Sequence, residues 1–182
     1  MTARCALLLR AVNVSGRNRV PMAELRALLT ERVGLEDVST YIASGNVICA
    51  TPRDLAAACD EVRALIAAEF DVDTPVIART DAELAAVLAA NPFPDAASEK
   101  LLHVMFLEGD PADGAADALT PRLQAGERIA LRGRELWIDY GPGGVHSTKL
   151  TKAMLDRALG VAGTARNVLT ASKLVELTEG GA

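Results

Sequence analysis

The sequence has few of the residues that build several common kinds of site. Aromatic residues make up 3% of its 182 residues, and there are three cysteines and two histidines. The cysteines, Cys5, Cys49 and Cys59, show no C-x-x-C spacing, and His103 and His146 stand far apart, so no zinc-ligand pattern is present. We therefore expect no metal site and no cofactor. The cysteines are expected to be reduced core residues of a cytoplasmic protein, since no export signal is recognised.

Long apolar runs are also missing. No stretch approaches about 18 consecutive apolar residues, so no membrane span is predicted. The chain is 50% hydrophobic and 24% charged with a net charge of −5, a composition typical of globular proteins and not of disordered or fibrous ones. This length suits one ordinary domain or two small halves that share a core.

The first 80 residues predict the element order β-α-β-β-α-β. Apolar runs predict strands at 5–14, 38–43, 46–50 and 74–79, and amphipathic segments predict helices at 21–33 and 54–70. A split βαβ pair with two helices on one face of a four-stranded antiparallel sheet is the ferredoxin-like arrangement.

The remaining residues predict a similar order. Strands are expected at 100–108, 127–131 and 135–140, and helices within 111–124, at 147–159 and at about 167–177. The final helix takes the place of a fourth strand. We predict an α+β fold of two ferredoxin-like (βαββαβ-type) halves, with antiparallel sheets and helices on one face. The first half spans 1–90, a Pro-rich hinge spans 91–98, and the second half, with its extra C-terminal helix, spans 99–182.

Basic residues gather near the two ends of this acidic chain. Residues 1–20 contain Arg4, Arg10, Arg17 and Arg19 without any Asp or Glu, and residues 141–182 contain five basic residues against three acidic ones. If the two regions meet in space, they form a local positive site. A small anion suits such a site better than nucleic acid, which requires an extended basic stripe or stacking aromatics. Solvated surface charges are the alternative interpretation.

The segment Arg10–Arg19 lies between a predicted buried strand and a predicted helix. Backbone amides of a Gly-containing turn can hold an anion, and arginines add bidentate donors. The pattern is neither a P-loop nor a dinucleotide fingerprint. A turn in which Asn and Gly merely permit positive φ explains it equally well.

Two other loops are candidates for the same site. The first predicted hairpin turns at Ser44-Gly45-Asn46, which offers a hydroxyl and an amide, although Gly and Asn are also common at hairpin tips. Ser147 is expected to cap the following helix, with Lys149 in its first turn. The helix dipole disfavours a cation there, which supports a bound anion, although a plain cap followed by a surface lysine explains the pattern at least as well.

The stretches LLLRAVNVSGRNRVPMAELRALL, YIASGNVI, STKLTKAML and ARNVLTASKL together resemble the bacterial domain-of-unknown-function family 1697 over nearly the whole chain. The resemblance implies a bacterial cytoplasmic α+β protein without a settled activity. The family pattern marks Arg10, Asn13, Gly16, Asn18, Ser44, Gly45, Asn46, Lys149, Leu150, Arg166, Asn167 and Thr170. The chain departs from it at Ala11 and Ser15, where glycine is common, and at Ala165, Val168 and Leu169, where polar or aromatic residues are usual.

Charge and resemblance together predict a protein that binds a small phosphate- or carboxylate-bearing ligand between the first strand–helix loop and the C-terminal helices. The expected ligand-binding residues are Arg10, Asn13, Arg17, Asn18, Ser44, Asn46, Lys149, Arg166, Asn167 and Thr170. One alternative is a cofactor-free transferase or hydrolase that uses the same pocket, with His146 as its candidate base. Another is a nucleic-acid or protein interaction module, which the scarcity of aromatics disfavours. Whether the chain is an enzyme, and whether it is a monomer or a dimer, is left open.

Overall fold

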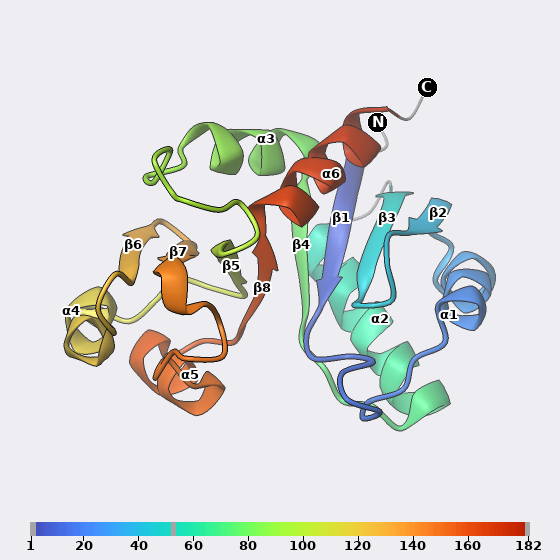
Figure 1. Cartoon of the computed structure of the whole chain (residues 1–182). Coiled ribbons are helices and arrows are strands. Elements are labelled where there is room, and N and C mark those ends of the chain that lie inside the picture. The colour runs from blue at the N-terminus through green and yellow to red at the C-terminus, as the bar shows by residue number, and fades with distance from the viewer. Residues whose placement is uncertain (1–2, 52–53, 181–182) are drawn as a thin grey trace. The chain divides into compact units, whose positions relative to one another are not determined.

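The computed structural model of the chain describes residues 3–51 and 54–180 (Figure 1). The chain forms two compact units. The first unit consists of Met1–Ala85 together with Lys173–Ala182, and the second unit consists of Ala86–Ser172. Each unit has its own four-stranded sheet.

The sheet of the first unit has the strand order β2-β3-β1-β4, with every neighbouring pair antiparallel. Its strands are β1 (Ala3–Leu9), β2 (Glu36–Thr40), β3 (Asn46–Thr51) and β4 (Val76–Thr80). Helix α1 (Met22–Leu28), extended by a π-helical turn (Leu29–Val33), connects β1 to β2, and α2 (Leu55–Phe70) connects β3 to β4. This is the predicted ferredoxin-like order.

Both helices of the first unit cover the same face of its sheet. Cys5, Leu7 and Leu9 of β1 are fully buried in one core with Leu25 of α1 and Val62 of α2. Alternate residues of a strand face the same side, so these three side chains point together toward the helices. The prediction that the helices pack on one face is confirmed.

The thiols of β1 and β3 lie in this same core. Cys5 and Cys49 are fully buried, and their Sγ atoms are 3.6 Å apart without a disulfide. Both act as small core residues, as predicted.

The sheet of the second unit has the equivalent strand order, β6-β7-β5-β8, and is also antiparallel. Its elements are β5 (Leu102–Leu107), α4 (Ala115–Leu119), a 3₁₀ turn (Thr120–Arg122), β6 (Arg128–Arg132), β7 (Glu135–Asp139), a 3₁₀ turn (Gly141–Gly143), α5 (Lys152–Leu159) and β8 (Gly163–Asn167). Leu107 of β5 and Ile138 of β7 pack against Leu119 of α4 and Leu155 of α5. Both halves therefore have the βαββαβ order.

Strand β8 corrects the prediction that a helix replaces the fourth strand of the second half. Its sequence, GTARN, contains no large apolar residue, so it gave no strand signal. The strand is formed by pairing with β5, in which Phe106 is opposite Thr164. The predicted final helix follows it as α6 (Val168–Glu179).

The helix predicted at 147–159 begins later than expected, at Lys152. Thr151 caps it, because its hydroxyl accepts a hydrogen bond from the N–H of Met154 (3.3 Å). Ser147 is not the cap; its hydroxyl donates to the carbonyl of Gly144 (3.0 Å). Lys149 precedes the helix, so the argument for an anion from the helix dipole was wrong.

The segment predicted as a hinge, 91–98, lies inside the second unit. Arg128 of β6 anchors it by donating to both carboxylate oxygens of Asp95 (3.0 and 3.1 Å) and by lying over the ring of Phe93, 4.6 Å from its centroid. The two compact units divide within α3 (Asp81–Ala89) and within α6. A continuous helical pattern gives no sequence signal of such a boundary.

The end of α6 is held by the first unit's sheet. Arg4 of β1 donates from Nε to the carbonyl of Thr178 (2.8 Å) and from Nη2 to that of Leu177 (3.3 Å). A cation at a helix C-terminus satisfies carbonyls that have no partner within the helix and matches the negative end of its dipole. These bonds join the end of α6 to the first unit.

Candidate functional site

The predicted site residues are divided between the two units. Six lie in the first unit, namely Arg10, Asn13, Arg17, Asn18, Ser44 and Asn46, and four in the second, namely Lys149, Arg166, Asn167 and Thr170. The pocket that was predicted to combine them stays a prediction, and the two sets are described separately.

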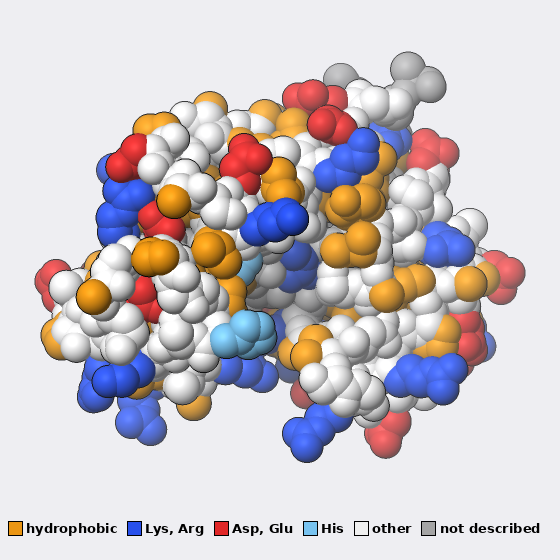
Figure 2. Space-filling view, viewed as in Figure 1, with side chains coloured by type: hydrophobic (Ala, Val, Ile, Leu, Met, Phe, Trp, Pro, Cys, Tyr) orange, Lys and Arg blue, Asp and Glu red, His pale blue; other side chains and the backbone are white. Residues whose placement is uncertain are grey.

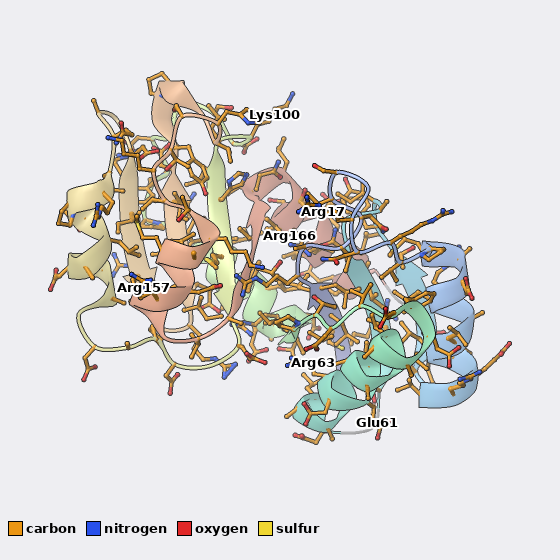
Figure 3. The ribbon with its side chains drawn as sticks, turned by 90° about the horizontal axis from the view of Figure 1, so that it is seen from below. Arg17, Glu61, Arg63, Lys100, Arg157 and Arg166 are labelled. Atoms are coloured by element: carbon orange, nitrogen blue, oxygen red, sulfur yellow. The ribbon has the colours of Figure 1, made fainter. Side chains whose placement is uncertain are left out.

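The first loop, residues 10–19, begins where β1 ends at Leu9. The strand predicted from the sequence ended five residues later, at residue 14. Its tip is a type I′ turn, in which the N–H of Arg17 donates to the carbonyl of Val14 (2.9 Å). Ser15 (φ 51°) and Gly16 (φ 75°) occupy the two central positions, both of which require positive φ. The exposed side chain of Arg17 follows directly (Figure 3).

The rest of the loop is also rich in left-handed backbone. Ala11, Asn13 and Asn18 have φ values of 51°, 54° and 50°. Asparagine tolerates this region, whereas alanine and serine adopt it at a cost of about 1–2 kcal/mol per residue. Ala11 and Ser15 are the positions where the family pattern commonly has glycine, so the structure explains that preference by backbone conformation.

Asn13 connects the first loop to the turn between β2 and β3. Its Nδ2 donates to the carbonyls of Val20 (2.9 Å) and Ala43 (2.7 Å), and its Oδ1 accepts from the N–H of Val20 (2.9 Å). Both donors of the amide are thereby used. Asn18 has a similar role within the loop, donating to the carbonyl of Ala11 (2.9 Å). Both side chains fix the loop's shape, and their predicted contact with a ligand stays a prediction.

The β2–β3 turn packs closely against the end of β1. The carbonyl of Gly45 accepts from the N–H of Leu9 (2.8 Å), and a Cβ on Gly45 would lie 2.7 Å from Leu9 Cβ and Val12 Cγ2. Asn46 is fully buried, and its Nδ2 donates to the carbonyl of Tyr41 (3.0 Å) and to Ser44 Oγ (3.2 Å). Asn46 is therefore also a residue that positions the loops.

The arginines of the first loop differ in exposure. Arg10 is buried, and its backbone is fixed by Thr74, whose hydroxyl donates to the Arg10 carbonyl (2.6 Å) and accepts from its N–H (3.2 Å). Arg17 and Arg19 are exposed, and neither side chain forms a hydrogen bond or ion pair with any residue in 3–51 or 54–180. These two guanidinium groups carry the loop's accessible positive charge.

The second-unit set has its own local structure. Arg166 is buried, with Nη1 donating to Thr164 Oγ1 and to the carbonyl of Ala165, both at 2.8 Å. Burial lowers the pKa of Arg166 to about 10, because the charged form is poorly solvated there. Asn167 caps α6, since its Oδ1 accepts from the N–H of Thr170 (2.9 Å). A ligand-binding role for these residues and for the exposed Lys149 stays a prediction.

Neither histidine shows the hydrogen bonds of a general base. His146 is exposed and forms no hydrogen bond with any other described residue. His103 lies on β5, where its ring makes an edge contact with Tyr140 at 5.0 Å between centroids. Burial lowers the pKa of His103 to about 4. It is a residue of the sheet.

A feature that the sequence did not indicate lies in the second unit. A cavity of about 500 Å³ opens between α4 and α5, and its lining includes Arg122 and Arg157. The two residues are 35 positions apart and belong to no recognised motif, so only the packing of the helices relates them.

Other kinds of site find no support in the described part of the chain. No group of three or more His, Cys, Asp or Glu residues there could hold a metal ion. None of its helices has the length and apolar character needed to cross a lipid bilayer. Basic and acidic side chains are interspersed over the face of the molecule seen in Figure 2.

Fold and site together define an α+β protein of two ferredoxin-like halves with a preformed basic loop after its first strand. The chain belongs to the family of proteins of unknown function DUF1697, which matches residues 1–137. This confirms the resemblance inferred from the sequence motifs.

A solved structure supports the same fold over almost the whole chain. It is "The structure of conserved bacterial protein SP0830 from Streptococcus pneumoniae", which is 25% identical in sequence with a TM-score of 0.75. The match covers 98% of this chain and 99% of that chain. No curated protein matches the sequence.

Proposed function

We propose that this protein binds a small phosphate- or carboxylate-bearing ligand at the first loop, residues 10–19. The observation that carries the proposal is a set of exposed donors that the protein does not use. The backbone N–H groups of Ser15, Gly16, Asn18 and Arg19 donate to no acceptor among the described residues. Backbone amides gathered in a tight turn with left-handed residues are a common way to bind anions.

The charge of the loop favours the same ligand. Residues 10–19 contain three arginines and no acidic residue. Arg17 and Arg19 can each present two parallel N–H donors to a carboxylate or phosphate. A net charge of −5 for the whole chain makes this local positive charge a distinguishing feature rather than part of a basic surface.

The rigidity of the loop also supports binding. The amide of Asn13 and that of Asn18 hold the loop in one conformation before any ligand arrives. A preformed site loses less conformational entropy on binding than a flexible one. The unfavourable φ values at Ala11 and Ser15 have a functional reason if they aim the loop's donors at a ligand.

A thermal-shift screen tests the proposal. The panel contains inorganic phosphate, nucleotides, sugar phosphates, small carboxylates and short oligonucleotides. A ligand at 100 times its Kd stabilises the protein by about 2.7 kcal/mol, a Tm increase of about 5–10 °C for a chain of this size. We expect a small anion to raise the Tm of the wild type and to lose that effect in Arg17→Ala/Arg19→Ala.

The matched control is Lys100→Ala/Lys152→Ala, which removes the same charge from exposed residues of the second unit that line no proposed site. It should keep the shift. If no anion of the panel raises the Tm, or if the loop variant keeps the full increase, the proposal is wrong. A shift with oligonucleotides alone would favour the nucleic-acid alternative.

A further inference from the structure

The cavity between α4 and α5 has apolar walls that belong to both helices. Four alanines, Ala115, Ala118, Ala153 and Ala158, and the side chain of Met154 line it. Alanine side chains are too short to fill the space between two packed helices, so a gap of about 500 Å³ is left. This volume lies within the range of about 300–1,000 Å³ found for small-molecule sites.

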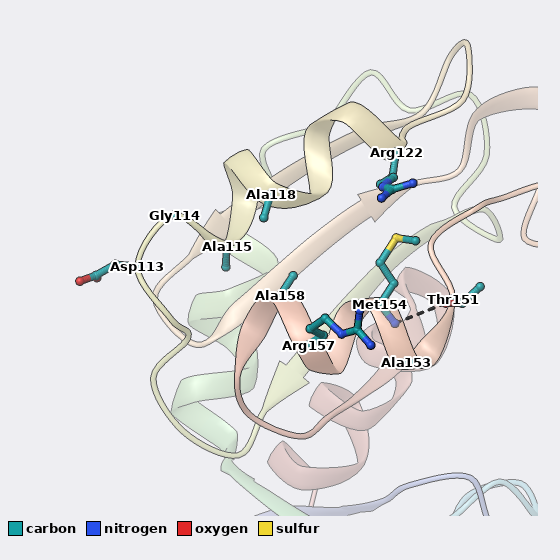
Figure 4. A pocket seen from close by; sticks show the side chains of 10 residues that line it. All are labelled: Asp113, Gly114, Ala115, Ala118, Arg122, Thr151, Ala153, Met154, Arg157 and Ala158. Carbon is teal, nitrogen blue, oxygen red and sulfur yellow. Dashed lines mark hydrogen bonds between the residues drawn. The ribbon is translucent and has the colours of Figure 1, made fainter.

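Two positive charges border these apolar walls. Arg122, at the end of the turn after α4, and Arg157, on α5, both belong to the lining of the cavity (Figure 4). Neither guanidinium forms a hydrogen bond or ion pair with any of the residues that the structure describes. Asp113, the one acidic residue of the lining, points away from the gap. The cavity therefore combines an apolar surface with unneutralised cations.

We propose that this cavity binds a small organic anion that has an apolar body and a single carboxylate, phosphate or sulfonate head. The head lies between Arg122 and Arg157, each of which can offer it paired N–H donors. The body covers the alanines and Met154, whose flexible thioether adapts to ligands of different shape.

Thr151 adds a polar group at the edge of the same cavity. Its hydroxyl accepts a hydrogen bond from the N–H of Met154 (3.3 Å) and keeps its own proton available to donate. An anionic head that reaches the start of α5 can accept that proton in a hydrogen bond. The lining of the cavity thus supplies donors, and its acidic side chain, Asp113, points away from the gap.

This site is independent of the proposed function. Its residues all lie in the second unit, whereas the first loop lies in the first unit. A variant that abolishes ligand binding at the first loop therefore leaves binding at the cavity testable, and the reverse also holds.

The experiment compares two fluorescent probes that differ in charge. Anilinonaphthalene sulfonate has an apolar body and an anionic head, and N-phenylnaphthylamine has a similar body without the charge. We expect the sulfonate to bind the wild type saturably. Its affinity for Arg122→Ala/Arg157→Ala should be at least about tenfold lower, since each lost charge-assisted contact reduces affinity. The neutral probe should bind the wild type more weakly than the sulfonate does. Its affinity should be the same for the wild type and for Arg122→Ala/Arg157→Ala.

Three further variants locate the binding. Lys152→Ala removes one positive charge from the same helix outside the cavity and should change the affinity less than twofold. Arg17→Ala/Arg19→Ala should leave it unchanged. Ala118→Phe, which fills the cavity, should weaken both probes, and amide chemical shifts of α4 and α5 should be those that move on binding.

The proposal is overturned if the double variant at Arg122 and Arg157 binds the sulfonate as the wild type does. It is also overturned if the two probes bind equally, or if the shifts that move lie outside α4 and α5. Arg122→Gln/Arg157→Gln, which removes the charge but keeps a shorter polar side chain, serves as a second form of the double variant should the alanine form be poorly folded.

Discussion

The close approach of Gly45 to the end of β1 allows a quantitative test of how the first loop is built. Gly45 has a φ of 85°, and a Cβ there would lie 2.7 Å from Leu9 Cβ and Val12 Cγ2. Gly16 has a similar φ of 75°, but a Cβ there would have no heavy atom within 4 Å. The pair Gly45→Ala and Gly16→Ala therefore separates crowding from backbone conformation.

The expected magnitudes follow from these two terms. A left-handed alanine costs about 1–2 kcal/mol, and loss of a glycine's freedom in the unfolded chain returns about 0.4–1 kcal/mol. Gly16→Ala should thus lower the free energy of unfolding by about 1 kcal/mol or less. Gly45→Ala carries the same terms and adds about 1–3 kcal/mol for overpacking against Leu9, which is buried in β1. We expect it to destabilise by about 2–4 kcal/mol.

Urea denaturation followed by circular dichroism measures both values. The slope m must stay equal to that of the wild type, so that the change in midpoint reports stability alone. Equal costs for the two variants, within about 0.5 kcal/mol, would refute the argument that Gly45 is required by close packing.

Three other predictions concern the loop and the second sheet. Ala11→Gly should stabilise the protein by up to about 1 kcal/mol in urea denaturation, because relief of a left-handed alanine exceeds the entropy that glycine adds to the unfolded chain; a destabilised variant would contradict the strain at this position. Asn13→Ala should lower the free energy of unfolding by about 3 kcal/mol, since it removes three hydrogen bonds and places alanine at positive φ. Asn18→Ala removes one such bond and should lower it by about half as much or less. Equal losses of stability in the two variants would show that the hydrogen bonds of Asn13 contribute little. His103 has its pKa lowered by burial to about 4, so its contribution to stability is complete above about pH 6.5 and falls by up to about 3 kcal/mol as the pH drops toward 4. His103→Gln should lose that part of the pH dependence, and wild-type and variant stability curves that stay parallel between pH 6.5 and 4.5 would contradict it.

The parts of the fold that sequence reasoning predicted are those in which hydrophobic periodicity decides the structure. β5 is a run of apolar residues, and α2 has an N-cap at Asp54 whose carboxylate accepts from the N–H of Ala57 (3.1 Å), so both were found nearly at their observed bounds. β8 was missed because its residues pair with β5 without supplying apolar side chains. Residues 163–167 form a strand only because they pair with β5, and the local sequence contains no pattern that predicts this pairing.

The sequence indicated which residues belong to the loops of the candidate site, but not which hydrogen bonds their side chains form. Asn13 and Asn46 have amides that could serve a ligand or the backbone equally well, and a sequence does not state which acceptors lie within 3 Å. Their donors are taken by the carbonyls of Val20, Ala43 and Tyr41. The cavity bordered by Arg122 and Arg157 depends on the spacing of two helices, so it had no sequence signal at all.

The substitutions in the first loop show how its shape is maintained without all of the glycines that the family pattern favours. Ala11 and Ser15 stand in left-handed conformations that destabilise the loop by about 1–2 kcal/mol each. The amides of Asn13 and Asn18 offset this through four hydrogen bonds, each contributing about 0.5–1.5 kcal/mol. The two terms are of similar size, so the loop can keep its conformation with alanine and serine as long as both asparagines are present. The exposed donors of Ser15, Gly16 and Arg19 thus depend for their positions on side chains that need not touch the ligand.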